Sequence, residues 1–544
     1  MFNKLRQLIE TKHKAIVVSF FALFFLISLS GIKDYGLNWD EEMQWKLNGE
    51  VVGDYIFHHD ERAREALKSS AEKYHGPAFE LVLVCIQKVF QLKETRSVYL
   101  MRHVVTFLVF YFGIIIFYFL GKRCFKDWKF AFIGCIFLAL SPRIFGDSFH
   151  NSKDIPFLSF FLMSMYALLN FHEQPTYKNA IIYAFISAFA IDIRIIGILL
   201  PAFSFLFFGV DCIFALLYKK KERLYIKSFV FYCSCLVAFI ILFWPILWEG
   251  PIDHFINAFK EMSQFHWNEA VFFQEVYIKA TDLPWDYLPV WISITTPIPY
   301  LILFLIGLFF IFKQCLTSPI NFIFYMREQQ LMLMSFVVPL LMIIILESVV
   351  YDGWRHVFFI YPAFIMIGIY GLSYLYKLLN KRKSVVSILV ALVICYNAVA
   401  MIQLHPNEYV YFNSFAGKDM KQVKERYEMD YYGVSSIQAL EYILKNDNSP
   451  IIKINVDRYP QILNLQMLKV AEQKRILFCS LKDAAYYIGQ YRYHHEEYNF
   501  DNKCFSVMVG NASIMSVFKL TENDRKKKIT NNWKTWEERW RELQ

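Results

Sequence analysis

The chain has 544 residues, of which 56% are hydrophobic and 19% aromatic, and Phe alone contributes 55. This composition excludes an ordinary soluble domain, because apolar stretches long enough to cross a hydrocarbon core recur along its first three quarters. The net charge of +9 does not indicate nucleic-acid binding, since the basic residues concentrate in short loops between those stretches.

About eleven apolar stretches are predicted to span the membrane, because each approaches the length that crosses a core of about 30 Å. The first follows a basic N-terminus, but it is long and has no evident cleavage site, which indicates a retained anchor. The stretches are residues 15–32, 104–120, 130–142, 155–169, 180–193, 195–217, 229–248, 298–312, 331–346, 357–376 and 385–402.

Four clusters of Lys and Arg lie beside these stretches, at residues 4–14, 122–129, 219–227 and 377–383. With a cytoplasmic N-terminus and alternating spans, all four clusters fall on the cytoplasmic side, as the positive-inside rule requires. The odd number of spans then places the C-terminal tail outside. The main outer loops are predicted at residues 33–101, 143–154 and 249–297, and residues 79–90 are predicted to form an interfacial helix.

The first outer loop begins with three consecutive carboxylates, Asp40, Glu41 and Glu42. A carboxylate near the membrane interface can take a proton from an attacking hydroxyl or amine, and it can also help to hold a divalent cation. The alternative is a solvated helix start, where the helix dipole favours acidic residues. The sequence alone supports both interpretations equally.

The second outer loop is short and holds several groups that can carry chemistry. It places Asp147, His150, Lys153 and Asp154 directly before a predicted span. Polar groups at the mouth of a span often serve function, because burying them without a partner is unfavourable. Lys153 and Asp154 would otherwise only cap and anchor the following helix. A functional role is the preferred interpretation.

A third polar group lies at residues 351–356, directly before another span. Arg355 and His356 fall where a lipid phosphate would lie, and Arg binds phosphate in a bidentate manner. An interfacial Arg can instead extend toward lipid headgroups without further function. The same choice applies to Arg194, between two closely spaced spans, and to Arg102, at the outer end of the second span.

The composition changes after residue 402, where ordinary charge and alternating patterns replace the apolar stretches. The chain is therefore divided into a membrane domain, residues 1–404, and a small extracytoplasmic α/β domain, residues 405–544. Strands are predicted at residues 451–456, 476–479 and 513–520, and helices at 435–445 and 481–490. Residues 524–544 are predicted to form a charged surface helix. Cys479 and Cys504 are candidates for a disulfide in such a tail.

Three features in this order resemble one superfamily. They are an Asp-Glu pair early in the first outer loop, an Asp directly before a later span, and a late Arg-His followed by Tyr361 and Pro362. The segment Leu-His-Pro-Asn-Glu-Tyr-Val-Tyr-Phe-Asn, residues 404–413, is similar to a motif that follows the last span in bacterial members. The chain resembles the GT-C glycosyltransferases, particularly the bacterial branch related to protein O-mannosyltransferases and the aminoarabinose transferases of lipid A.

The resemblance implies a bacterial inner-membrane enzyme that inverts the configuration of a sugar taken from a polyprenyl-phosphate donor. By analogy Asp40 is the general base with Glu41 beside it, and Asp154 orients the acceptor or a metal ion. The donor phosphate would face Arg355, His356 and Arg194. Relatives often carry a Lys-Pro-Pro segment in the first outer loop, whereas residues 73–77 here read Lys-Tyr-His-Gly-Pro. Lys73 and His75 are nonetheless candidates for phosphate binding.

Two other functions agree with the same pattern. A lipid-linked sugar flippase or transporter would have similar spans, although the sequence shows no internal repeat of the kind that transporters carry. A polymerase or ligase that uses polyprenyl-diphosphate glycans would suit the same site. The acceptor is predicted to be a lipid, a glycan or a protein, no nucleic acid is expected, and a divalent metal ion at Asp40 and Asp154 stays possible.

Overall fold

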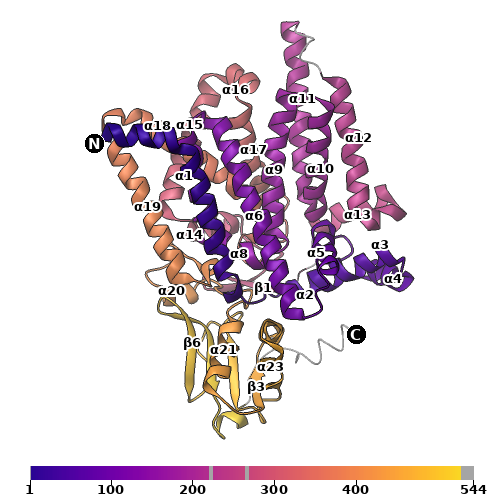
Figure 1. Cartoon of the computed structure of the whole chain (residues 1–544), viewed down its shortest axis with the longest axis vertical. Helices are drawn as coiled ribbons and strands as arrows, with labels where there is room; N and C mark the ends of the chain where they lie inside the picture. Colours follow the sequence, from indigo (N-terminus) through magenta and orange to yellow (C-terminus); the bar gives the residue numbers. More distant parts are fainter. Residues whose placement is uncertain (1, 71, 220–224, 264–266, 268, 528–544) are drawn as a thin grey trace.

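The computed structural model describes residues 2–70, 72–219, 225–263, 267 and 269–527, and apart from strands β1 to β7 its regular elements are helical (Figure 1). Lys220, Lys221 and Arg223 of the third basic cluster lie outside the described residues. So does most of the predicted charged helix 524–544, of which only a short 3-10 turn at Asp524–Lys526 is described.

The predicted polytopic membrane bundle is confirmed. Within the described part of the chain, nine helices are long and apolar enough to cross a membrane, and the bent pair of α7 and α8 would make a tenth. At the predicted span 180–193 lies α10, which has 17 residues and packs against α9 and α12. The helices of the bundle are α1 (Phe2–Gly31), α6 (Thr95–Phe125), α7 (Trp128–Ala139), α8 (Pro142–His150), α9 (Asp154–Glu173), α10 (Tyr177–Ile193), α11 (Leu199–Tyr218), α12 (Ile226–Phe243), α15 (Ile298–Thr317), α17 (Arg327–Ile345), α18 (Tyr361–Leu378) and α19 (Lys383–Leu404).

The chain bends by 64° between α7 and α8. Pro142 opens α8 and has no backbone N–H to continue the preceding helix. The hydroxyl of Ser141 donates to the carbonyl of Phe137 at 2.7 Å and lies 2.9 Å from the Tyr361 hydroxyl, which fixes the bend against α18. The second outer loop, predicted at 143–154, is therefore largely a buried helix.

The helix α18 lies at the centre of the bundle, and every residue from Tyr361 to Ile369 is buried. It packs closely against α15, because Gly307 and Gly371 leave no side chain between the two backbones. A Cβ atom on Gly307 would lie only 1.9 Å from the carbonyl oxygen of Ile367. Small residues of this kind allow membrane helices to approach closely. The start of α18, which carries part of the site described below, is thus held by tight packing.

The long loops gather at one end of the bundle, and α16 (Pro319–Tyr325) lies at the opposite end (Figure 1). The helix predicted at residues 79–90 is present as α5. The elements of these loops are α2 (Glu41–Met43), a π-helix (Gln44–Val51), α3 (Val52–His58), α4 (Glu61–Ser69), α5 (Ala78–Val89), α13 (Pro251–Ser263), β1 (Ala270–Phe273), β2 (Val276–Lys279) and α14 (Tyr287–Thr295).

The C-terminal part contains a small mixed sheet, which lies against the loop-rich end of the bundle (Figure 1). The strand order is β4-β3-β5-β7-β6, with β3 parallel to β4 and β5, and β7 antiparallel to β5 and β6. The small α/β domain predicted from sequence is therefore confirmed. Its elements are α20 (Met420–Lys424), α21 (Ser436–Asn446), β3 (Ile452–Val456), α22 (Tyr459–Leu463), α23 (Val470–Gln473), β4 (Ile476–Phe478), β5 (Tyr486–Gln490), β6 (Lys503–Val509) and β7 (Ala512–Lys519).

Two expectations for this domain are corrected. The helix predicted at residues 481–490 is instead the central strand β5, whose five residues are all buried. The candidate disulfide is absent, and Cys479 and Cys504 are both free cysteines. Cys479 follows the edge strand β4 and Cys504 lies on β6 at the other edge. Strands about 4.8 Å apart separate the two cysteines far beyond the reach of a disulfide.

Candidate functional site

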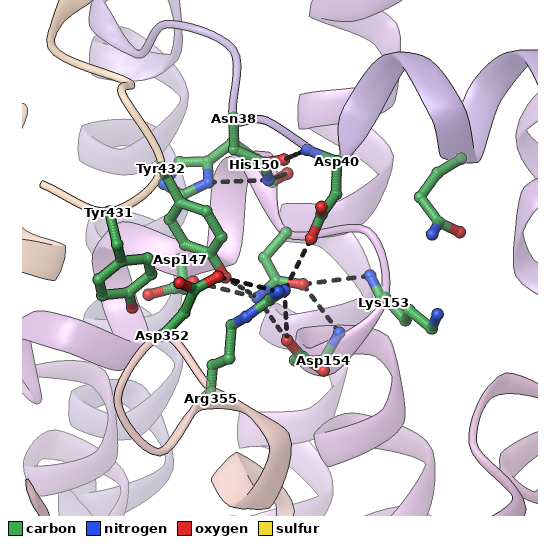
Figure 2. A network of polar contacts seen from close by, with 12 residues as sticks. Asn38, Asp40, Asp147, His150, Lys153, Asp154, Asp352, Arg355, Tyr431 and Tyr432 are labelled. Carbon is green, nitrogen blue, oxygen red and sulfur yellow. Dashed lines mark hydrogen bonds and ion pairs between the residues drawn. The ribbon is translucent and has the colours of Figure 1, made fainter. Parts of the chain in front are cut away.

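The residues of the candidate site meet where the bundle faces the C-terminal domain. Three carboxylates surround the guanidinium of Arg355 (Figure 2). Its Nη1 lies 2.7 Å from Oδ2 of Asp40 and 3.7 Å from Oδ2 of Asp154, and its Nη2 lies 3.1 Å from Oδ2 of Asp352. Three of the predicted site residues, Asp40, Asp154 and Arg355, are thus brought together from segments far apart in the chain.

Each of the three is fixed by the element next to it. Asp40 is the residue before α2, Asp154 opens α9, and Arg355 begins a 3-10 helix that leads into α18. All three lie at helix ends and outside the apolar middle of a span, where an unpaired charge would be costly. The ends of the bundle helices therefore determine the geometry of the cluster.

The carboxylates differ in exposure, and the difference separates their roles. The side chain of Asp154 is 1% exposed and is paired with Arg194, and it also accepts a hydrogen bond from Nδ2 of Asn151 at 3.0 Å. The side chain of Asp40 is 40% exposed. Within the described residues, the hydrogen bonds and ion pairs of the Asp40 carboxylate involve only Oδ2, and Oδ1 carries no such contact. Asp40 is the carboxylate that a substrate can reach.

The segment that carries Asp40 is anchored on both sides. Nδ2 of Asn38 donates to the carbonyl of His150 at 2.5 Å, and the Asn38 backbone N–H donates to Oε2 of Glu41 at 2.9 Å. Oε1 of Glu41 lies 2.9 Å from Nε2 of His103. Both oxygens of this buried carboxylate are engaged. Glu41 is therefore placed to hold the loop and does not contact Arg355 alongside Asp40.

Basic side chains border the cluster on its other side. Burial, together with the nearby charge of Arg194, lowers the pKa of Lys153 to about 8. None of the hydrogen bonds or ion pairs of the described residues uses the ammonium of Lys153. His75 is paired with Glu72, and burial lowers the pKa of this histidine. His356 packs edge-on against the ring of Tyr351. Lys153 and Arg194 thus form a basic surface next to Asp154, and the two histidines border it.

Two predicted candidates, Lys73 and Arg102, lie apart from this cluster, and a third, His150, lies in its network without contacting Arg355 (Figure 2). The Nζ atom of Lys73 donates to the carbonyl oxygen of Lys68 at 3.3 Å. Arg102 forms a buried ion pair with Glu80 at 2.6 Å. His150 is fully buried, with its ring edge-on to Tyr409 and Tyr432. The family resemblance suggested a phosphate role for Lys73, and the sequence left the role of Arg102 open, whereas their side chains contact Lys68 and Glu80 here.

Two residues of the cluster were absent from the sequence-based candidates. Asp352 bridges Arg355 and Arg492, and Arg492 belongs to the C-terminal domain. The hydroxyl of Tyr432 accepts a hydrogen bond from Nδ2 of Asn151 at 2.9 Å, and its ring lies beneath the guanidinium of Arg355. Asp352 is the second residue of the polar stretch 351–356, so its neighbours could have drawn attention to it. Tyr432 has no local signal, since it lies in an ordinary polar tail.

A divalent cation does not fit these carboxylates as they are arranged. Asp40 and Asp154 are each held by an arginine guanidinium, which would repel a metal ion at the same oxygens. Across the described ranges, no group of three or more His, Cys, Asp or Glu side chains is placed to hold a metal ion.

Comparison with known proteins gives one family match. Residues 74–248 match the sequence model of the family described as dolichyl-phosphate-mannose-protein mannosyltransferase. The match confirms the predicted resemblance to protein mannosyltransferases over about a third of the chain. It includes Asp154 and Lys153 but ends before Arg355. No curated protein sequence matches the chain.

Several solved structures share similarity along most of the chain at low identity. ArnT from Cupriavidus metallidurans in the apo state is 13% identical, with 95% of this chain and 100% of that chain covered and a TM-score of 0.46. The apo oligosaccharyltransferase of Archaeoglobus fulgidus is 10% identical, with coverages of 85% and 64% and a TM-score of 0.46. Mycobacterial arabinofuranosyltransferase AftD is 8% identical, with coverages of 93% and 40% and a TM-score of 0.42.

Proposed function

We propose that this chain is a membrane glycosyltransferase that moves a sugar from a polyprenyl-phosphate donor to an acceptor with inversion of configuration. The observation that carries the proposal is the arrangement around Asp40. A half-exposed carboxylate at the end of the first span lies beside a basic surface that includes the unpaired Lys153. The family match of residues 74–248 supports the same reaction class.

The reaction needs a base and a group that accepts the leaving charge. Asp40 takes the proton of an acceptor hydroxyl or amine as that atom attacks the anomeric carbon of the donor sugar. The bond from the anomeric carbon to the phosphate oxygen breaks on the opposite face, and polyprenyl phosphate departs with the electron pair. Arg355 holds Asp40 in place through Oδ2 and leaves Oδ1 for the acceptor.

The donor phosphate is placed against the basic surface. The Lys153 ammonium can bind the phosphate without breaking an existing ion pair. Arg194 and Arg355 add guanidinium groups that Asp154 holds in place. His356 and His75 border this region, and Lys73 lies in the same loop as His75. Glu41 and Arg102 are assigned to positioning the loop and α6. The acceptor, a lipid, a glycan or a protein, approaches from the exposed side of Asp40.

The topology proposed for this reaction places the site on the extracytoplasmic face of a bacterial inner membrane. The N-terminus is cytoplasmic, residues 1–404 form the membrane domain, and residues 405–544 form an outer domain. The basic loops between the spans support this orientation. The donor lipid stays in the bilayer while its phosphate and sugar reach the cluster at the membrane surface.

Purified full-length protein in detergent, supplied with radiolabelled polyprenyl-phosphate sugars and membrane extract, tests the proposal. Wild type should transfer label, and Asp40→Asn should lose about 100-fold or more of the turnover, as loss of a general base requires. Asp54→Asn, at an exposed carboxylate of α3, is the matched control and should keep wild-type turnover. Full turnover by a folded Asp40→Asn protein would remove Asp40 from the role of base.

A further inference from the structure

The candidate site is joined to the C-terminal domain through one buried carboxylate. Oδ2 of Asp352 lies 3.1 Å from Nη2 of Arg355, and Oδ1 of Asp352 lies 2.7 Å from Nη2 of Arg492. The three side chains are at least nine-tenths buried. A buried carboxylate between two guanidinium groups can lose neither partner without leaving uncompensated charge.

The backbone around Asp352 adds to the constraint. Asp352 has φ +56° and Gly353 has φ +70°, so two successive residues adopt the left-handed region. Asp tolerates this conformation less well than Gly, and it persists only where surrounding contacts hold it. Arg492 supplies such a contact from outside the bundle, and its other nitrogen, Nη1, is fixed by the carbonyl of Tyr431 at 2.6 Å.

The two terminal nitrogens of Arg355 contact different carboxylates. Its Nη2 is directed to Asp352 while its Nη1 contacts Asp40 and Asp154. Arg492 shares the negative charge of Asp352, so that Asp352 orients Arg355 without drawing the guanidinium away from Asp40. With Arg492 removed, Arg355 is the one remaining cation that contacts Asp352 among the described residues. The guanidinium of Arg355 is then attracted more strongly to Asp352 and held less firmly against Asp40.

We infer that Arg492 is a positioning residue through which the C-terminal domain sets the orientation of Arg355, by way of Asp352. The inference deepens the proposed glycosyl transfer and rests on it for its catalytic consequence. The outer domain is then a part of the active site. This assigns the domain a role in catalysis that does not depend on its binding the acceptor.

The test compares Arg492→Gln, Arg492→Lys and the control Arg475→Gln in full-length protein. Arg475 also donates to backbone carbonyls of the C-terminal domain, but it contacts Ser449 and Asp447, away from the site. Hydrogen exchange over residues 347–356 should be faster in Arg492→Gln than in wild type or Arg475→Gln. This readout requires no transfer activity.

The catalytic readout uses kcat and its dependence on pH. Burial raises the pKa of Asp352, and Arg492 opposes that rise, so Arg492→Gln should move the acid limb of the profile to higher pH. Turnover should fall by about tenfold or more and recover in part in Arg492→Lys. Asp352→Asn combined with Arg492→Gln should be no slower than Asp352→Asn alone, because the two residues act in one chain of contacts.

The outcomes separate this inference from the proposed function. Slower turnover, a shifted acid limb and a loosened loop in Arg492→Gln alone support the link. Wild-type exchange and an unchanged pH profile in Arg492→Gln would overturn it while leaving glycosyl transfer intact. If wild type transfers no sugar, the proposed function fails, and the exchange of residues 347–356 alone decides whether Arg492 holds the loop.

Discussion

The arginine and the carboxylates of the site divide their roles by burial. Arg355 and Asp154 are enclosed, whereas Asp40 at the same cluster is half-exposed. A buried charge is held in one geometry by its partners, and an exposed one remains available to a second molecule. The arrangement therefore presents one accessible carboxylate beside a fixed set of ion pairs.

The protonation state of Lys153 predicts how binding of a lipid phosphate depends on pH. Its pKa of about 8 in the free protein means that the cationic form is lost as the pH rises through 8. Under the proposed function, binding of a polyprenyl phosphate, measured by calorimetry in detergent, should weaken between pH 7 and pH 9.5. Lys153→Arg should keep its affinity across this range, because arginine stays protonated.

A matched pair of lysines supplies the control for that measurement. Lys73→Met removes a cation that faces the Lys68 carbonyl, and Lys153→Met removes the unpaired cation next to Asp154. We expect Lys153→Met to weaken lipid phosphate binding at pH 7 by about tenfold, in the range of one charge-assisted hydrogen bond. Stronger weakening in Lys73→Met than in Lys153→Met would reverse the assignment.

The sequence predicted those residues of the site whose own neighbours in the chain mark them as unusual. Asp40, Asp154 and Arg355 stand in short polar segments beside apolar spans, where unusual charge is visible without a structure. His103, which contacts Glu41, and Glu80, which pairs with Arg102, lie in other segments, so the local sequence does not distinguish an anchor from a reactive group. Tyr432 and Arg492 reach the site only through the docking of a separate domain.

At the scale of elements, an ion pair joins α5 to α6. Arg102 and Glu80 are both almost fully buried, and Oε1 of Glu80 also accepts from the Ser152 hydroxyl at 2.7 Å. Arg102→Met leaves the Glu80 carboxylate without its cation, so we expect destabilisation of about 3–5 kcal/mol. Thermal unfolding in detergent measures this loss.

The companion variant for that pair is Glu80→Leu combined with Arg102→Met. Removing both charges leaves no uncompensated group in the interior, so the double variant should unfold at a higher temperature than Arg102→Met alone. An Arg102→Met protein as stable as wild type would show that the pair contributes little to holding α5 against α6.

The sequence predicted best the elements that have one clear hydrophobic periodicity or a long apolar run. The spans and α21 are of this kind, and so is the edge strand β4. Strand β5 was interpreted as a helix because its residues, Tyr486 to Gln490, are buried on both faces and show no alternation. The bend before Pro142 was missed for a related reason, since α8 is buried throughout and reads as a loop by polarity alone.

At the scale of the whole molecule, a histidine joins the end of the first span to the end of the last. Nε2 of His405 lies 2.9 Å from Asp34, and its Nδ1 lies 2.9 Å from Glu408. These carboxylates raise the pKa of His405 to about 9, with the Glu408 hydrogen bond contributing most. The stabilisation is complete below about pH 6.5, the unfolded value, and is lost as the pH rises through 9.

The expected result is a melting temperature that falls between pH 7 and pH 10 in wild type. His405→Gln should melt lower than wild type at pH 6.5 and show a smaller decline over the same range. His58→Gln, at an exposed histidine of α3, serves as the control and should follow wild type. Identical pH dependence in wild type and His405→Gln would exclude His405 as the source of the decline.

The contact between Asp352 and Arg492 also has a consequence for biosynthesis. A ribosome makes Asp40, Asp154 and Arg355 well before Arg492, and domains generally fold in the order in which they are made. A nascent chain that has inserted its last helix still lacks the final cation of the cluster. The proposed site is therefore complete only when the C-terminal domain has been translated and folded, so that maturation of the protein itself times the onset of the proposed activity.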